Sequence, residues 1–183
     1  MGSITISPTN LNGVHLINAA MFLDNRGGFT KIFQKEEFDA HCLQSDFSEC
    51  YYSTSRKGVV RGMHFQIPPH EHAKLIYVTS GKITDVVLDI RRNSSTYGKF
   101  FSTELSSRNG LAIYISPGFA HGFESLENDS CVTYLQTSVH EPEFDMGIHF
   151  NSFEMNWETS HAIVSERDSN FPSLQAFNTP FEI

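Results

Sequence analysis

Cysteine is scarce in this chain and follows no pattern. The three cysteines, Cys42, Cys50 and Cys131, are an odd number, and no two of them have CxxC spacing. A disulfide framework needs an even set, and a zinc knuckle needs closely spaced pairs. The sequence therefore predicts neither, and we expect reduced thiols in a cytoplasmic protein.

Long apolar runs are missing as well. No stretch approaches the roughly 20 apolar residues that a helix needs to cross a bilayer. Residues 1–6 have neither the basic region nor the apolar core of a secretory signal. Ile6 stands where an N-myristoylation motif carries Ser or Thr. We therefore expect no membrane partner.

Positive charge is in the minority. The chain has 13 Lys and Arg against 21 Asp and Glu, which gives a formal net charge of −8. Proteins that bind nucleic acid depend on clustered basic residues, so we expect no nucleic-acid partner. An anionic ligand would need local cations, and Arg26, Arg61 and Lys74 are the candidates.

Short β-type runs bounded by Gly, Asn, Ser and Pro dominate the pattern. The chain of 183 residues shows no repeat, low-complexity tract or linker, which favours one domain over 1–183. Many short strands at close spacing predict an all-β sandwich or barrel rather than a βαβ fold. The clearest strands are expected at 74–78, 83–90, 111–115 and 131–137, with shorter ones within 11–33.

Turns and helices occupy little of the pattern. Ser80-Gly81-Lys82 predicts a tight hairpin, because glycine tolerates the positive φ that such turns need. The best early helix candidate is 35–43. A second short helix is expected within 165–177, with Ser165 as its N-cap and Pro172 ending or bending it.

Several polar residues lie inside these apolar runs. Arg61 and His64 fall within 61–66, Lys74 opens the next run, and His121 lies in 116–123. A polar side chain that is buried without a partner costs several kcal/mol, about 2 to 7. If the strands close into a barrel, alternate positions point into one cavity. The sequence therefore predicts an enzyme pocket.

Strand alternation places two of the candidates on inward faces. Lys74 shares a face with Ile76 and Val78, and Tyr134 shares a face with Val132. A lysine on an apolar face is unfavourable unless it meets an anion or a developing negative charge. Either requirement indicates chemistry at Lys74.

The run 61–66, followed by Lys74-Leu75, resembles the signature of the dTDP-4-dehydrorhamnose 3,5-epimerase family. Residues 85–91, 94–98 and 117–123 are similar to further motifs of that family, in order, from about residue 20 to 175. The amino-terminal motif is matched by Phe22, Asp24, Arg26, Gly27 and Phe29. The resemblance implies a cupin-type β jelly roll with a few short peripheral helices. It also implies a homodimer that exchanges strands within about 1–33, and no metal or cofactor.

The resemblance also implies a reaction and the residues that perform it. Members act on nucleotide-linked 4-keto-6-deoxy sugars and invert C3, C5 or both, in surface-polysaccharide (lipopolysaccharide O-antigen) biosynthesis. His64 matches the catalytic base and Asp168 the carboxylate that orients it. Tyr134 matches the acid, and Lys74 the lysine that stabilises the enolate.

The binding positions follow by the same resemblance. Arg61, Gln66 and His121 match pocket positions around the sugar and the diphosphate. Arg26 and Phe29 match residues given to the nucleotide site of the neighbouring subunit.

The chain departs from the family pattern around the ligand. Lys31 stands where the family usually has an acidic residue, and His72 where it usually has a glutamine. Glu49 and Tyr51 stand in the region that usually offers Gln and Asn side chains. Val139 and His140 replace two adjacent tyrosines that many members have. None of these changes falls on the four catalytic positions. We therefore expect the reaction class to carry over, with the nucleotide (dTDP, CDP or GDP), the sugar and the inverted carbon left open.

Three other hypotheses remain. His70-Glu71-His72 has the HxH spacing of a metal site on a strand, which with His121 would make a metal-dependent cupin enzyme such as a dioxygenase. Against it, 74–77 lacks the usual carboxylate, and Pro68-Pro69 indicates a loop. The others are a non-catalytic cupin that binds nucleotide sugars, and a sugar ketoisomerase on the same barrel.

Overall fold

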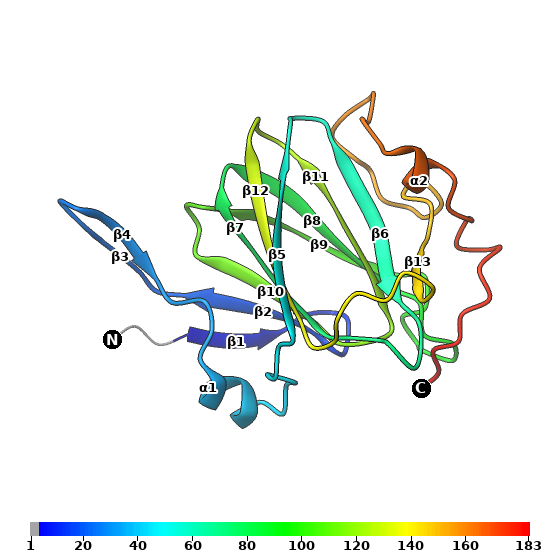
Figure 1. Cartoon of the computed structure of the whole chain (residues 1–183), viewed down its shortest axis with the longest axis horizontal. Coiled ribbons are helices and arrows are strands. Elements are labelled where there is room, and N and C mark those ends of the chain that lie inside the picture. Colours follow the sequence, from blue (N-terminus) through cyan, green and yellow to red (C-terminus); the bar gives the residue numbers. More distant parts are fainter. Residues whose placement is uncertain (1–3) are drawn as a thin grey trace.

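Two antiparallel sheets face each other in this computed structural model, which describes residues 4–183 (Figure 1). The first three residues of the expected domain lie outside that range. One sheet has the order β1 (Ile4–Pro8), β2 (Val14–Ala19), β10 (Leu111–Ile115), β7 (Lys74–Ser80), β12 (Ser130–Gln136), β5 (Glu49–Ser55). The other has the order β13 (Asp145–Gly147), β6 (Val60–Gln66), β11 (Phe119–Ser125), β8 (Lys82–Asp89), β9 (Phe100–Ser106). The predicted all-β class is confirmed.

Apolar residues at alternate strand positions fill the space between the sheets. Ile76 and Val132 from the larger sheet pack with Val87 and Phe123 from the smaller one. The outer face of the five-stranded sheet is also buried, because the carboxy-terminal tail covers it with side chains such as Leu174. Burial on both faces makes this sheet a rigid support for side chains that point inward.

Most of the predicted elements are present. The four clearest strands are found within one or two residues of their expected bounds, and Gly81 turns the β7–β8 hairpin with a φ of +73°. Helix α1 (Lys35–Ala40) is shorter than the expected 35–43, because Cys42 adopts a φ of +56° and the chain turns back on itself. Neither helix of residues 4–183 is long and apolar enough to cross a membrane.

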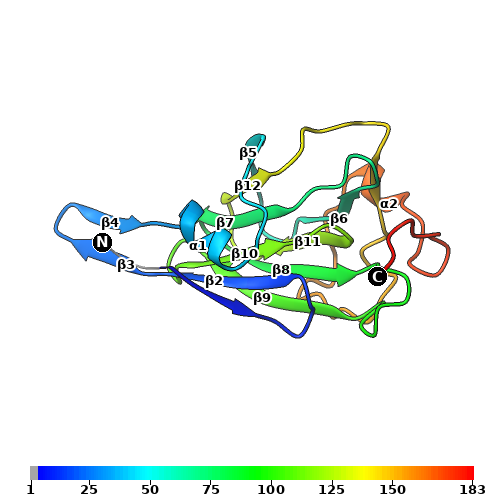
Figure 2. The ribbon, with the colours of Figure 1, turned by 90° about the horizontal axis from the view of Figure 1, so that it is seen from below.

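The hairpin of β3 (Met21–Asp24) and β4 (Gly27–Thr30) stands clear of both sheets (Figures 1 and 2). Its side chains Phe22, Leu23 and Phe29 are exposed, and Phe29 is 58% exposed. By contrast, β1 pairs with β2, and β2 pairs with β10 of the same chain. Within residues 4–33, the segment that extends away from the two sheets is therefore this hairpin.

The motif around Asp89 stabilises the loop that follows β8. Arg91 Nη2, Ser94 Oγ and Thr96 Oγ1 all donate to Asp89 Oδ2, at 2.6, 2.7 and 2.6 Å. Burial alone would raise the pKa of Asp89, but these donors outweigh it and hold the pKa below its usual value. Some of the residues that match the family over 85–98 therefore stabilise this loop.

Candidate active site

A β-bulge in β6 brings the exposed Arg61 and the half-buried His64 to the wall of the same cavity. Residues three apart on a regular strand point to opposite faces. Here Arg61 pairs with Phe123 and His64 pairs with His121, so β6 carries an extra residue between the two pairs. Gly62 makes this possible with a φ of +124°; a Cβ there would lie 2.6 Å from Gly122 Cα.

His64 is held by a carboxylate from the carboxy-terminal tail. His64 Nε2 lies 2.9 Å from Asp168 Oδ1, and Asp168 Oδ2 accepts from Gly62 N at 2.9 Å. Asp168 lies in helix α2 (Glu166–Ser169), whose predicted N-cap Ser165 accepts from Asp168 N. In a neutral His64, Nε2 therefore keeps its hydrogen and donates it in a hydrogen bond to Asp168 Oδ1. Nδ1 then carries the lone pair and can accept a proton.

The ionised state of Asp168 is favoured by these contacts. Burial alone would raise the pKa of Asp168, but the hydrogen bonds from His64 and Gly62 outweigh it and lower the pKa. A permanent negative charge beside His64 stabilises the imidazolium that forms when His64 takes a proton.

Lys74 is the first residue of β7 and points inward, as predicted. It is 7% exposed, and its Nζ donates to the carbonyl oxygen of His64 at 3.2 Å. Burial lowers the pKa of Lys74 to about 8, against the opposing pull of Asp145 and Asp85. The ammonium group therefore lies in a dry setting, where its charge acts strongly on a developing anion.

Tyr134 is a buried phenol on β12. Its ring stacks on Tyr51, with ring centroids 4.8 Å apart and planes at 16°. Burial raises the pKa of Tyr134, so its hydroxyl keeps its proton at neutral pH and is a donor. Tyr51 is fixed in turn by Gln136 Nε2, which donates to its hydroxyl at 2.7 Å.

A second histidine–carboxylate pair lies beside the first. His121 Nε2 is 2.7 Å from Asp85 Oδ2, and both side chains are buried. Burial lowers the pKa of His121, against the pull of Asp85. The sequence analysis assigned no role to Asp85. An acidic residue at an inward position of the apolar strand β8 could have identified it as a site residue.

Two adjoining cavities contain most of the predicted residues. The smaller, of about 190 Å³, is lined by Tyr51, Ser53, Arg61, His64, Lys74, His121, Phe123 and Tyr134. The larger, of about 340 Å³, is lined by Glu49, Tyr51, His64, Phe65, Gln66, His72, Lys74, Gln136, His140, Asp145 and Arg167. The two cavities share Tyr51, His64 and Lys74, so one elongated ligand can fill both.

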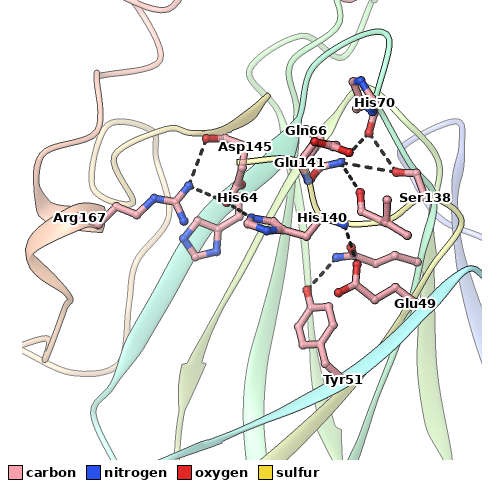
Figure 3. A network of polar contacts seen from close by, with 12 residues as sticks. Glu49, Tyr51, His64, Gln66, His70, Ser138, His140, Glu141, Asp145 and Arg167 are labelled. Atoms are coloured by element: carbon pink, nitrogen blue, oxygen red, sulfur yellow. Dashed lines mark hydrogen bonds and ion pairs between the residues drawn. The ribbon is translucent and has the colours of Figure 1, made fainter. Parts of the chain in front are cut away.

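Gln66 lies in the larger cavity with its amide already engaged (Figure 3). Its Nε2 donates to the carbonyl oxygens of His70 and Val139 at 2.7 and 3.2 Å. Its Oε1 accepts from Glu141 N at 2.7 Å. Gln66 thus braces the loop after β12, and the substrate contact expected of it stays a prediction.

An ion cluster forms part of the lining of the larger cavity (Figure 3). Arg167 Nη2 and His140 Nε2 lie 2.8 and 3.0 Å from Asp145 Oδ2. The main chain of His140 donates to Glu49 Oε2 at 2.7 Å. Sequence reasoning missed Asp145 and Arg167; the position of Arg167 next to Asp168 was the available signal.

Arg26 and Phe29 lie elsewhere, on the β3–β4 hairpin. Arg26 Nη2 forms an exposed ion pair with Asp24 Oδ2 at 2.6 Å. Neither residue lines the two cavities of its own chain. Their expected role at a neighbouring subunit stays a prediction.

The HxH sequence does not lie on a strand. Residues 70–72 form a loop before β7, where the His70 ring packs on Phe144 and His72 Nδ1 contacts Ser138. Within residues 4–183, no three His, Cys, Asp or Glu side chains are grouped to hold a metal ion. The strand geometry that the metal hypothesis needs is therefore not formed by these residues.

Comparisons with known proteins agree with this geometry. The family model described as dTDP-4-dehydrorhamnose 3,5-epimerase matches residues 8–176. A relative of that name from Sinorhizobium fredii is 36% identical over 92% of this chain and 89% of its own. A dTDP-4-dehydrorhamnose 3-epimerase from Streptomyces niveus is 31% identical over 90% of this chain and 81% of its own.

A solved structure of an epimerase has a similar fold. The dTDP-6-deoxy-D-glucose-3,5-epimerase of Legionella pneumophila, in complex with dTDP-4-keto-L-rhamnose, superposes with a TM-score of 0.92. It is 28% identical and covers 98% of both chains. With the sequence match across nearly the whole chain, the fold and the paired cavities, the chain belongs to the dTDP-4-dehydrorhamnose 3,5-epimerase family.

Proposed function

We propose that this enzyme inverts C3, C5 or both in a nucleotide-linked 4-keto-6-deoxy sugar. The observation that carries the proposal is the smaller cavity, which a carboxylate-held histidine, a buried lysine and a buried phenol all line. These groups match the needs of proton removal beside a ketone: a base, a cation for the enolate oxygen and a second proton source.

His64 Nδ1 takes the proton from the carbon beside the C4 ketone, and the imidazolium is stabilised by Asp168. The electron pair of the broken C–H bond moves onto the ketone oxygen, where the Lys74 ammonium stabilises the enolate. Tyr134 then gives its phenolic proton to the same carbon on the opposite face, as the enolate electron pair returns to that carbon and the ketone re-forms. Exchange with solvent returns the proton of the His64 imidazolium and reprotonates Tyr134. The oxidation state of the sugar is unchanged, so the reaction calls for no redox partner.

Binding involves the remaining predicted residues. Arg61 is steadied by Ser55 Oγ and Thr54 O, both at 3.0 Å, and offers a guanidinium to the diphosphate beside the sugar. His121 and Gln66 border the sugar. Among dTDP, CDP and GDP, the names of the relatives favour dTDP. The relative named for C3 alone supports inversion at a single carbon as an outcome within this family.

The setting is proposed on the same basis. We place the enzyme in the cytoplasm, where nucleotide sugars serve as building blocks for surface polysaccharides such as the lipopolysaccharide O-antigen. We propose a homodimer in which the β3–β4 hairpin extends to the neighbouring subunit. Its exposed Phe22, Leu23 and Phe29 support this, because exposed apolar patches mark interaction surfaces.

The function is tested by incubating 4-keto-6-deoxy sugars linked to dTDP, CDP and GDP with the enzyme in D2O. Deuterium at C3 and C5 is followed by NMR. We expect deuterium at one or both carbons together with an inverted product, for one nucleotide above the others. A wild-type enzyme that exchanges neither position of any of these sugars would contradict the proposal.

In the same experiment, Tyr134→Phe separates exchange from inversion. The variant keeps the stacked ring but loses the phenolic proton, so deuterium exchange should persist while inverted product falls about 100-fold. Tyr52→Phe is the matched control, because Tyr52 is an exposed phenol on the same strand as Tyr51. Equal losses of exchange and of product would remove Tyr134 from the role of opposite-face donor.

A hybrid dimer tests the hairpin. Arg26→Ala and His64→Ala should each be poorly active alone. If Arg26 serves the neighbouring site, a mixed dimer has one site with both residues intact. Denaturing and refolding an equal mixture should then restore about a quarter of the wild-type sites, by random pairing in a two-fold dimer. No recovery, with dimers present by light scattering, would place Arg26 outside the neighbouring site.

A further inference from the structure

His72 is a buried histidine that the mechanism above does not use. It lies in the loop between β6 and β7, is 8% exposed, and lines the larger cavity together with His64 and Lys74. Its Nε2 is buried and has no hydrogen-bond partner within the part of the chain that the structure describes. An unsatisfied buried nitrogen of this kind is unfavourable, and the ring that carries it lines the cavity, which points to a ligand group as the missing partner.

The hydrogen bonds around His72 fix which nitrogen carries the proton. Ser138 Oγ donates to the carbonyl oxygen of His70 at 3.1 Å (Figure 3). Ser138 Oγ must then accept from His72 Nδ1, which lies 3.2 Å away. In the neutral ring, Nε2 therefore carries a lone pair and no proton.

The charge state agrees with this assignment. Burial, with help from the nearby Lys74 and His140, lowers the pKa of His72 to about 3. The ring is neutral at physiological pH, and its Nε2 is a hydrogen-bond acceptor only. A cationic amine would meet the repulsion of Lys74, so a neutral donor fits better.

We propose that His72 Nε2 accepts a hydrogen bond from a hydroxyl of the sugar and makes His72 a specificity-determining residue. This inference rests on the proposed function, which places the sugar against Lys74 and His64. A site that hydrogen-bonds a substrate hydroxyl rejects the analogue that lacks it. The substrate class is thereby narrowed to 4-keto-6-deoxy sugars that retain a hydroxyl on the carbons facing this loop.

The positions that depart from the family pattern gather at this cavity. Of the six, four line it: Glu49, Tyr51, His72 and His140. A glutamine amide, usual in the family at position 72, can turn either a donor or an acceptor toward a ligand. The imidazole here presents an acceptor alone. The cavity is therefore more selective for a donor than the family pattern requires.

Two variants separate the two nitrogens. The amide of His72→Asn reaches the position of Nδ1 and can keep the Ser138 contact, but it places nothing at Nε2. The longer His72→Gln places an amide near Nε2. Both are assayed by deuterium exchange with dTDP-4-keto-6-deoxyglucose and with its 2-deoxy and 3-deoxy analogues. The binding of dTDP alone is measured by calorimetry.

We expect His72→Asn to raise KM about 10-fold for the fully hydroxylated sugar with little change in kcat, the size of one hydrogen bond. The difference from wild type should vanish with one deoxy analogue and persist with the other. His72→Gln should return KM for the fully hydroxylated sugar most of the way to the wild-type value. The affinity for dTDP alone should not change. His15→Asn, on β2 outside the cavity, is the control for the same side-chain change.

Two results would overturn the inference. An unchanged KM in His72→Asn would show that no substrate group meets Nε2. A loss that is equal for both deoxy analogues and for dTDP alone would assign the donor to the nucleobase or the effect to folding. In either case the wild-type enzyme still exchanges deuterium, whereas failure of the proposed function would leave wild type without exchange.

Discussion

Replacing His64 by alanine is expected to abolish deuterium uptake from D2O at both C3 and C5. His64 Nδ1 is the proton acceptor in the cavity, and its Nε2 is committed to Asp168 at 2.9 Å. A general base of this kind contributes about 100- to 10,000-fold, and the loss should lie near the upper end because the imidazolium is also stabilised by Asp168. NMR of the sugar carbons over a long incubation measures the residual rate.

The fold should tolerate this change. The side chain of His64 is about a third exposed, and Asp168 keeps its hydrogen bond from Gly62 N. Loss of the His64 hydrogen bond to the buried Asp168 should lower the temperature of thermal unfolding, but the Gly62 N donor remains, so the variant is expected to stay folded at neutral pH. His161→Ala is the matched control, because His161 is an exposed histidine outside both cavities. Exchange and product equal to wild type in His64→Ala would end the role assigned to His64.

Strand alternation predicted much of this site. A period of two is a local property, so the inward faces of β7 and β12 could be read without knowing their neighbours. That was enough to place Lys74 and Tyr134 inside, and the structure confirms both as buried. The short helix that presents Asp168 was also predictable, because its Ser165 cap is a local hydrogen bond.

Other features depend on which strands are neighbours, and sequence pattern does not contain that information. Alternation puts Arg61 and His64 on opposite faces, and only the bulge against β11 reverses this. Asp85 became a site residue because β8 lies beside β11, which carries His121. Asp145 is brought in by β13, a three-residue strand too short to show a pattern.

Lys74→Met is expected to lower kcat for exchange about 100- to 1,000-fold. The methionine keeps the length and apolar stem of the lysine but removes the charge that stabilises the enolate oxygen, and donors of this kind contribute that much. The pH profile of the exchange rate should report the titration of the Lys74 ammonium group. Burial lowers the pKa of Lys74 to about 8, so the wild-type rate should fall as pH rises through about 8. The variant should lack this fall.

The same substitution should make the protein more stable. In the unfolded chain the pKa of a lysine is about 10.4, so between about 8 and 10.4 the unfolded state binds more protons than the folded state. The stability of the wild type therefore rises with pH across that window, and at pH 7 the buried charge disfavours folding. Lys74→Met removes this penalty and should raise the free energy of unfolding by up to about 3 kcal/mol.

Activity and stability thus move in opposite directions at Lys74, which separates loss of chemistry from loss of fold. Chemical denaturation at pH 7 and pH 9.5 gives the two free energies of unfolding. Lys82→Met is the matched control; Lys82 pairs with Glu104 at the other end of the β7–β8 hairpin, and it should affect neither the rate nor its pH profile. A Lys74→Met enzyme that is both inactive and less stable at pH 7 would mean that the lysine serves the fold, and that the enolate is stabilised by another group.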